Sequence, residues 1–157
     1  MKRILESCTI LLLGLVATQT IASAEDTNDL EGLWFTKITV TDCHNVLLRN
    51  VQNFEMFLHD GSSIGPGGTV PPSPQALGRT DSVGMWRHLQ AHTYAATFWF
   101  FGLNPDGTLA SKVMAVRTIQ VNGDQFTGSD HVTVFDLSDH VLSTACTTVS
   151  ASRLRAP

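Results

Sequence analysis

The sequence predicts an all-β protein, a single antiparallel up-and-down β-barrel of about eight strands. After residue 30, no stretch repeats its apolar residues at a helical period over three turns. Runs rich in Val, Thr, Ile and Phe alternate with turn residues instead. The ends of the chain also match, because Gly32-Leu33-Trp34 opens the first strand-like run and Arg153 lies in the last. Matched ends favour a sheet that closes on itself, and a β-sandwich is the competing architecture.

The first 24 residues are predicted to be a signal peptide. Lys2 and Arg3 form a basic start, residues 9–17 form a short apolar core, and Ala22-Ser23-Ala24 is a small-residue cleavage site. The apolar core is too short for a permanent membrane anchor. Cleavage after Ala24 leaves residues 25–157 as a single domain, which is predicted to be secreted or periplasmic.

The charge of the mature chain argues against two classes of partner. Removing Lys2, Arg3 and Glu6 from the 10 basic and 14 acidic residues leaves 8 and 13, a formal net charge of −5. Nucleic-acid binding needs clustered Lys and Arg, which this chain lacks. The chain also has no basic amphipathic stretch that would suit a membrane surface.

Two cysteines remain after cleavage, Cys43 and Cys146. An even number of cysteines in an exported chain predicts one disulfide. A bridge between them closes a loop on the order of 100 residues, which the chain-entropy model values at roughly 4–5 kcal/mol. The alternative is a pair of buried free thiols.

The first strand-like runs cover residues 33–42 and 51–59. The second of these runs places Phe54, Met56 and Leu58 on one face. Asp60-Gly61 then signals a tight turn. Residues 62–83 are rich in Gly and Pro and predict a long irregular loop, either a lid or a plain flexible insertion.

The remaining residues predict strands joined by short turns. The strands are expected over 84–89, 92–103, 109–121, 125–137 and 141–154. Asn104-Pro105-Asp106-Gly107 is a hairpin signal, because Pro presets the first turn angle and Gly accepts the left-handed one. Asn122-Gly123 is the preferred type I′ pair, and a further turn is expected near Ser138-Asp139.

The pairing of Gly32-x-Trp34 with Arg153 resembles the calycin superfamily. The resemblance implies that Trp34 packs at the closed end of the barrel and that Arg153 lies across its ring, where a guanidinium gains cation–π attraction. The layout also looks like a group of exported bacterial lipocalin-like or allene-oxide-cyclase-like barrels, for which no activity is settled. The segments that carry this second likeness are Gly84-x-Trp86-Arg87, Tyr94-x-Ala96-x-Phe98, Asn104-Pro105-Asp106-Gly107-Thr108 and Phe126-Thr127-Gly128.

Hairpin geometry assigns side chains to the two faces of the sheet. Across the Pro105-Asp106 turn, Trp99 is expected opposite Val113, and across Asn122-Gly123, Ile119 is expected opposite Phe126. Arg117 and Asp130 then become diagonal neighbours on one face. If that face points inward, the charged pair lies in an apolar cavity, where it holds a polar ligand group or tunes a proton. The alternatives are an outward-facing surface pair, or the opposite face inside with Tyr94 as the polar contact.

These observations predict a barrel that binds a small, largely apolar molecule. Trp99, Phe98 and Phe126 are expected to supply contact area, and Arg117 to anchor an anionic or carbonyl end, with Asp130 beside it. One alternative is a cyclase or isomerase that needs no cofactor, and whether the protein is an enzyme stays open. The other is an interaction module that acts through an outer apolar face, which also predicts a homo-oligomer.

No metal site is predicted. The six histidines are scattered, and no carboxylate or cysteine completes a ligand set at a known spacing. No Gly-x-Ser-x-Gly elbow or phosphate-binding loop occurs either, so nothing in the chain calls for a cofactor.

Overall fold

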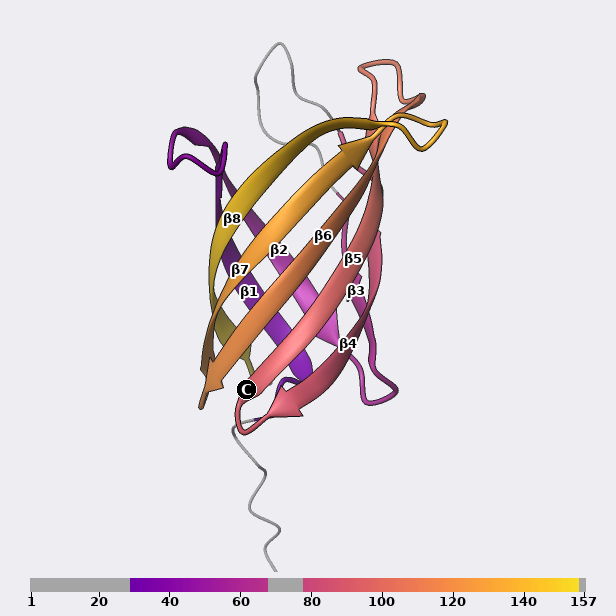
Figure 1. Ribbon diagram of the computed structural model, residues 1–157. Coiled ribbons are helices and arrows are strands. Elements are labelled where there is room, and N and C mark those ends of the chain that lie inside the picture. The colour runs from indigo at the N-terminus through magenta and orange to yellow at the C-terminus, as the bar shows by residue number, and fades with distance from the viewer. Residues whose placement is uncertain (1–28, 68–77, 156–157) are drawn as a thin grey trace, which may run out of the picture.

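The computed structural model describes residues 29–67 and 78–155, which form one closed barrel of antiparallel strands. Each strand pairs with the next one along the chain, and β1 pairs with β8 to close the sheet (Figure 1). The predicted all-β, up-and-down barrel is therefore confirmed. The predicted signal peptide, residues 1–24, lies outside the described residues. None of the described residues forms a helix long and apolar enough to span a membrane.

The strands follow the predicted runs, with one addition. Residues 62–83 were expected to be irregular throughout, but their first four form a short strand and Ser82 begins another. The predicted loop is thus wrong at both of its ends, and residues 68–77 lie outside the described residues. The bounds are β1 Gly32–Thr41, β2 Leu47–Phe57, β3 Ser62–Gly65, β4 Ser82–Gln90, β5 Thr93–Leu103, β6 Leu109–Asn122, β7 Gln125–Phe135 and β8 Val141–Leu154.

Trp34 and Arg153 lie together where the barrel closes. They are register partners on β1 and β8, and the Arg153 guanidinium lies 4.3 Å from the centre of the Trp34 ring. Arg153 also donates to the backbone carbonyls of Asp29 and Glu31, and Trp34 Nε1 donates to the Leu30 carbonyl at 2.9 Å. These contacts hold the segment before β1 across one end of the barrel.

The hydrophobic core fills this closed end. Trp34 is fully buried, and its ring meets Phe126 edge-on at 4.9 Å. Phe57 lies 6.2 Å from both Phe126 and Phe98, again in edge-to-face geometry, which the ring quadrupoles favour. The other fully or almost fully buried large side chains here are Leu30, Ile119 and Val121. This core closes one end of the barrel with apolar side chains.

Turns with a capping aspartate stand at the opposite end, where β1–β2, β5–β6 and β7–β8 connect (Figure 1). Asp42 Oδ1 accepts from the backbone N–H groups of His44 and Val46, and Asp106 and Asp136 act in the same way in the other two turns. Hydrogen bonds that favour the ionised form lower the pKa of all three carboxyls. These three short polar loops form part of the rim at this end of the barrel.

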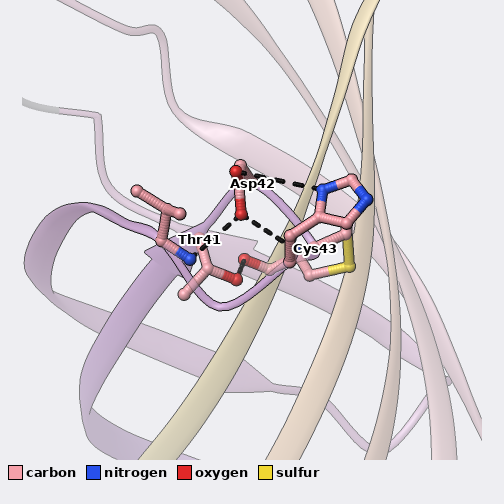
Figure 2. The surroundings of a disulfide bond; sticks show 6 residues. Thr41, Asp42 and Cys43 are labelled. Atoms are coloured by element: carbon pink, nitrogen blue, oxygen red, sulfur yellow. Dashed lines mark hydrogen bonds and ion pairs between the residues drawn. A yellow bond between two sulfur atoms is a disulfide. The ribbon is translucent and has the colours of Figure 1, made fainter.

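The disulfide predicted between Cys43 and Cys146 is present, with a Cα–Cα distance of 4.8 Å. Cys43 lies in the β1–β2 loop next to Asp42, as Figure 2 shows, and Cys146 lies on β8 beside Thr41 of β1. The bridge ties the β1–β2 loop to the seam at which the barrel closes. It is compatible with an extracellular or periplasmic location.

The predicted hairpin registers are wrong, because of a bulge in the first hairpin and of the position of the turn in the second. Trp99 pairs with Met114 instead of Val113, because Ala110 is an extra residue in β6 that shifts the β5–β6 register by one. The turn after β6 is centred on Gly123-Asp124, so Phe126 pairs with Val121, two residues from the expected Ile119. A register shift of one residue moves each β5 side chain to the face opposite the one expected from β6. A register shift of two residues leaves each β7 side chain on its expected face.

Candidate functional site

A cavity of about 510 Å³ occupies the half of the barrel that the core leaves empty. Its volume lies within the range of small-molecule sites. Apolar side chains make most of its wall, and inward-facing positions of seven strands contribute to it. The apolar lining residues are Ile38, Val40, Leu48, Val51, Phe98, Phe100, Val113, Ala115, Val132, Val134 and Ala145.

Three charged side chains meet on the floor of the cavity. Arg117 of β6 binds Asp130 of β7 with both ends of its fork, Nε to Oδ1 at 2.5 Å and Nη2 to Oδ2 at 2.9 Å. Its Nη1 donates to Glu55 Oε2 of β2 at 2.6 Å. The residues are 3%, 6% and 5% exposed, respectively, so the group is almost completely shielded from bulk water.

The register explains how these residues come together. Arg117 and Asp130 are direct partners in the β6–β7 ladder, so their side chains stand side by side on the inner face. Glu55 reaches Arg117 from the opposite wall of the barrel. Gly128 gives the Arg117 stem its room, because a Cβ at that position would lie 3.3 Å from Arg117 Cδ and 2.9 Å from the Thr118 carbonyl oxygen.

The two carboxylates keep Arg117 charged. Burial alone would lower its pKa, but the charges of Glu55 and Asp130 and their hydrogen bonds more than offset that penalty, and the pKa is raised. The guanidinium also lies 4.8 Å from the centre of the Phe98 ring, which covers one of its faces. Three of its N–H groups and one face are therefore already engaged within the protein.

Arginines line the cavity nearer its rim. Arg79 donates to the carbonyl of Pro66 at 2.8 Å and lies 5.1 Å from the Phe100 ring centre. Burial lowers the pKa of Arg79, and the charges of Glu55 and Asp81 partly oppose this shift. Arg49 also lines the cavity and is exposed. The cavity is thus positive at its rim and carries two acids on its floor.

The predicted ligand-binding residues divide into three groups. Arg117, Asp130 and Phe98 line the cavity together. Tyr94 and Phe126 are buried beneath it in the core, where Tyr94 packs 5.7 Å from Trp86. Trp99 points outward, is 38% exposed and stacks on Phe135 with Lys112 nearby. The expected placement of Trp99 on the same face as Arg117 is therefore wrong, as a result of the Ala110 bulge.

The sequence alone did not place Glu55 in this site and gave no indication of Thr147. Thr147 of β8 pairs with Asp130, lines the cavity and is 6% exposed, and its Oγ1 has no hydrogen-bond partner. Glu55 lies between Phe54 and Met56, and the sequence places these two apolar side chains together on one face without deciding which face of β2 lies inside. Only the pairing of β2 with its neighbours shows that Glu55 faces the inside of the barrel and its apolar neighbours face outward.

No cluster of three or more His, Cys, Asp or Glu side chains suited to a metal ion occurs within residues 29–67 and 78–155. The floor acids are engaged by Arg117 instead. Neither a protein-family model, nor a curated protein, nor a solved structure matches the chain. The site must therefore be interpreted from its own geometry.

Proposed function

We propose that this protein is an exported, calycin-type barrel that binds one small, largely apolar molecule in its interior. The observation that carries the proposal is the 510 Å³ cavity, with a mainly apolar wall and a polar group confined to its floor. Sites for small molecules combine apolar walls with a few placed polar groups in this way. The contact between Trp34 and Arg153 at the closed end supports the calycin likeness.

Burial of apolar surface supplies the affinity in this proposal. Side chains such as Ile38, Val113 and Val132 offer a ligand hydrocarbon contacts, and each Å² removed from water contributes about 25 cal/mol. Glu55 and Arg117 are held by their own ion pairs, so the floor is already organised before a ligand arrives. The alternative function, a cyclase or isomerase that needs no cofactor, stays a prediction that a turnover assay would test.

Titration with the neutral fluorophore N-phenyl-1-naphthylamine tests the proposal. We expect one probe to bind per barrel with a rise in its fluorescence. Ala145→Trp places a large side chain in the cavity, so it should weaken probe binding at least tenfold, or by about 1.4 kcal/mol.

The matched control is Ala95→Trp, which adds the same side chain to the outer face, since Tyr94 and Ala96 on either side are buried. It should leave the dissociation constant unchanged. Equal binding by wild type and Ala145→Trp, or no binding at all, would exclude the cavity as the site.

A second proposal concerns the outer face of the barrel. Met56, Ile64, Val83 and Trp99 are consecutive cross-strand partners on β2 to β5, and each is 38–60% exposed. They form an apolar belt that crosses four strands without a charged residue among its members. Apolar patches of this extent on a soluble protein mark contact surfaces. We propose that a second copy of this chain covers the belt, which makes the protein a homo-oligomer.

Light scattering after size-exclusion chromatography tests whether a second copy of the chain covers the belt. Val83 and Met85 lie two residues apart on the outer face of β4 and are 60% and 75% exposed. Replacing both with Lys should raise the dissociation constant of the oligomer at least tenfold. Thr127→Lys with Ser129→Lys adds the same charge to the exposed face of β7 and should have no effect. A wild-type protein that is monomeric at all concentrations would refute this proposal.

A further inference from the structure

The floor of the cavity carries one more negative than positive formal charge. Glu55 and Asp130 each contribute a carboxylate, and Arg117 contributes the one guanidinium between them. All three side chains are more than nine-tenths buried. The charge of Glu55 also acts on Arg79, which donates to the Pro66 carbonyl and lies outside this group of three. A net negative charge in a shielded site is costly, so the floor favours an additional cationic or hydrogen-bond-donating group.

Arg117 is poorly placed to bind an anion. Two N–H groups of Arg117 donate to Asp130 and a third donates to Glu55. Phe98 covers one face of the guanidinium. An anionic ligand group that approached it would also meet two carboxylates at close range. Like charges repel strongly in a shielded site.

Thr147 is an independent sign that the floor expects a hydrogen-bonding group. Its Oγ1 is buried and unpartnered, and Thr147 lines the cavity directly opposite Asp130 in the β7–β8 register. A buried hydroxyl without a partner loses the hydrogen bonds that it makes in water. A ligand group with several N–H donors can satisfy this oxygen and a carboxylate together.

We infer that the cavity takes an apolar molecule that ends in a primary ammonium group, with the ammonium on the floor beside Glu55, Asp130 and Thr147. This inference rests on the proposed function and deepens it. The hydrocarbon part then lies along the apolar wall formed by residues such as Ile38, Val113 and Val132. Arg49 and Arg79 also line the cavity, outside the ion-paired group on the floor.

Displacement of N-phenyl-1-naphthylamine by three compounds with the same chain tests the inference at neutral pH. We expect n-octylamine to displace the probe at a concentration at least tenfold lower than n-octanol or octanoate. Glu55→Gln keeps the shape of the side chain and removes its charge, so the advantage of octylamine over octanol should fall at least fivefold. Glu31→Gln removes the same charge outside the cavity and should leave that advantage intact.

Thr147→Val provides a second test if Glu55→Gln fails to fold. It replaces only the hydroxyl by a methyl group. The affinity for octylamine should fall about threefold or more, while the affinity for octanoate should stay unchanged. Equal displacement by octylamine and octanol would overturn the inference, because the floor would then show no preference for a cation. Tighter binding of octanoate, lost in Arg79→Gln, would also overturn it by placing the charged end at the rim. A probe that does not bind at all refutes the proposed function itself.

Discussion

Replacing Arg117 with Met is expected to lower the free energy of unfolding by about 3–5 kcal/mol. The substitution keeps much of the apolar stem but leaves Glu55 and Asp130, 5% and 6% exposed, without their cation. Two unpaired carboxylates in a shielded cavity cost far more than one lost surface ion pair. Urea unfolding monitored by circular dichroism measures the effect. The comparison is valid if the m-value, the slope of the free energy of unfolding against urea concentration, is unchanged.

Two further variants separate this cause from a general effect of removing an arginine. Arg87→Met, on an exposed position of β4, should change the free energy of unfolding by less than about 0.5 kcal/mol. Combining Arg117→Met with Glu55→Gln and Asp130→Asn removes all the charges and should recover most of the loss. A decrease below about 1 kcal/mol for Arg117→Met alone would contradict the buried ion-pair account.

Removing the disulfide is expected to cost about 4–5 kcal/mol in the chain-entropy model. Cys43 and Cys146 are 103 residues apart in the sequence, so the bridge removes much freedom from the unfolded chain. The comparison is between the wild-type protein and its Cys43→Ser, Cys146→Ser variant, unfolded in urea. The loss should appear largely as destabilisation of the whole barrel, since the bridge joins the β1–β2 loop to the closing strand β8.

Reductant supplies the control for this prediction. The wild-type protein in dithiothreitol should show the same stability as the double serine variant, and the variant itself should not respond to reductant. A difference of less than about 1 kcal/mol between oxidised and reduced wild type would show that the bridge does not stabilise the fold.

Local sequence signals were sufficient to predict the barrel. Alternating runs and turn residues predicted seven of the strands, and the two matching ends predicted that the first and last strands are neighbours. The contact between Trp34 and Arg153 was implied by the resemblance to calycins. The strand that was missed, β3, has only four residues and lies beside a Gly/Pro-rich segment. Its sequence, Ser62-Ser63-Ile64-Gly65, has a single residue that favours strands, so only its pairing with β2 and β4 reveals it.

The site was harder to predict because the barrel has apolar residues on both faces. Phe54 and Met56 look like core residues, yet they are 47% and 39% exposed and belong to the outer face, while Glu55 between them is buried. The single extra residue at Ala110 leaves no mark in the sequence and moves Trp99 from the inside to the outside. Arg117 and Asp130 were paired on one face because a shift of two residues preserves the alternation.

Methyl-detected NMR during titration with N-phenyl-1-naphthylamine tests the central proposal, that the ligand enters the barrel, most directly. Ile38, Val113 and Val132 line the cavity, whereas Ile64 and Val83 lie on the outer belt, so the same residue types report on both surfaces. The proposal predicts that the methyl signals of the first group shift and saturate at one probe per barrel, while those of Ile64 and Val83 stay in place. Shifts confined to Ile64 and Val83 would contradict it and place the probe on the outside of the barrel.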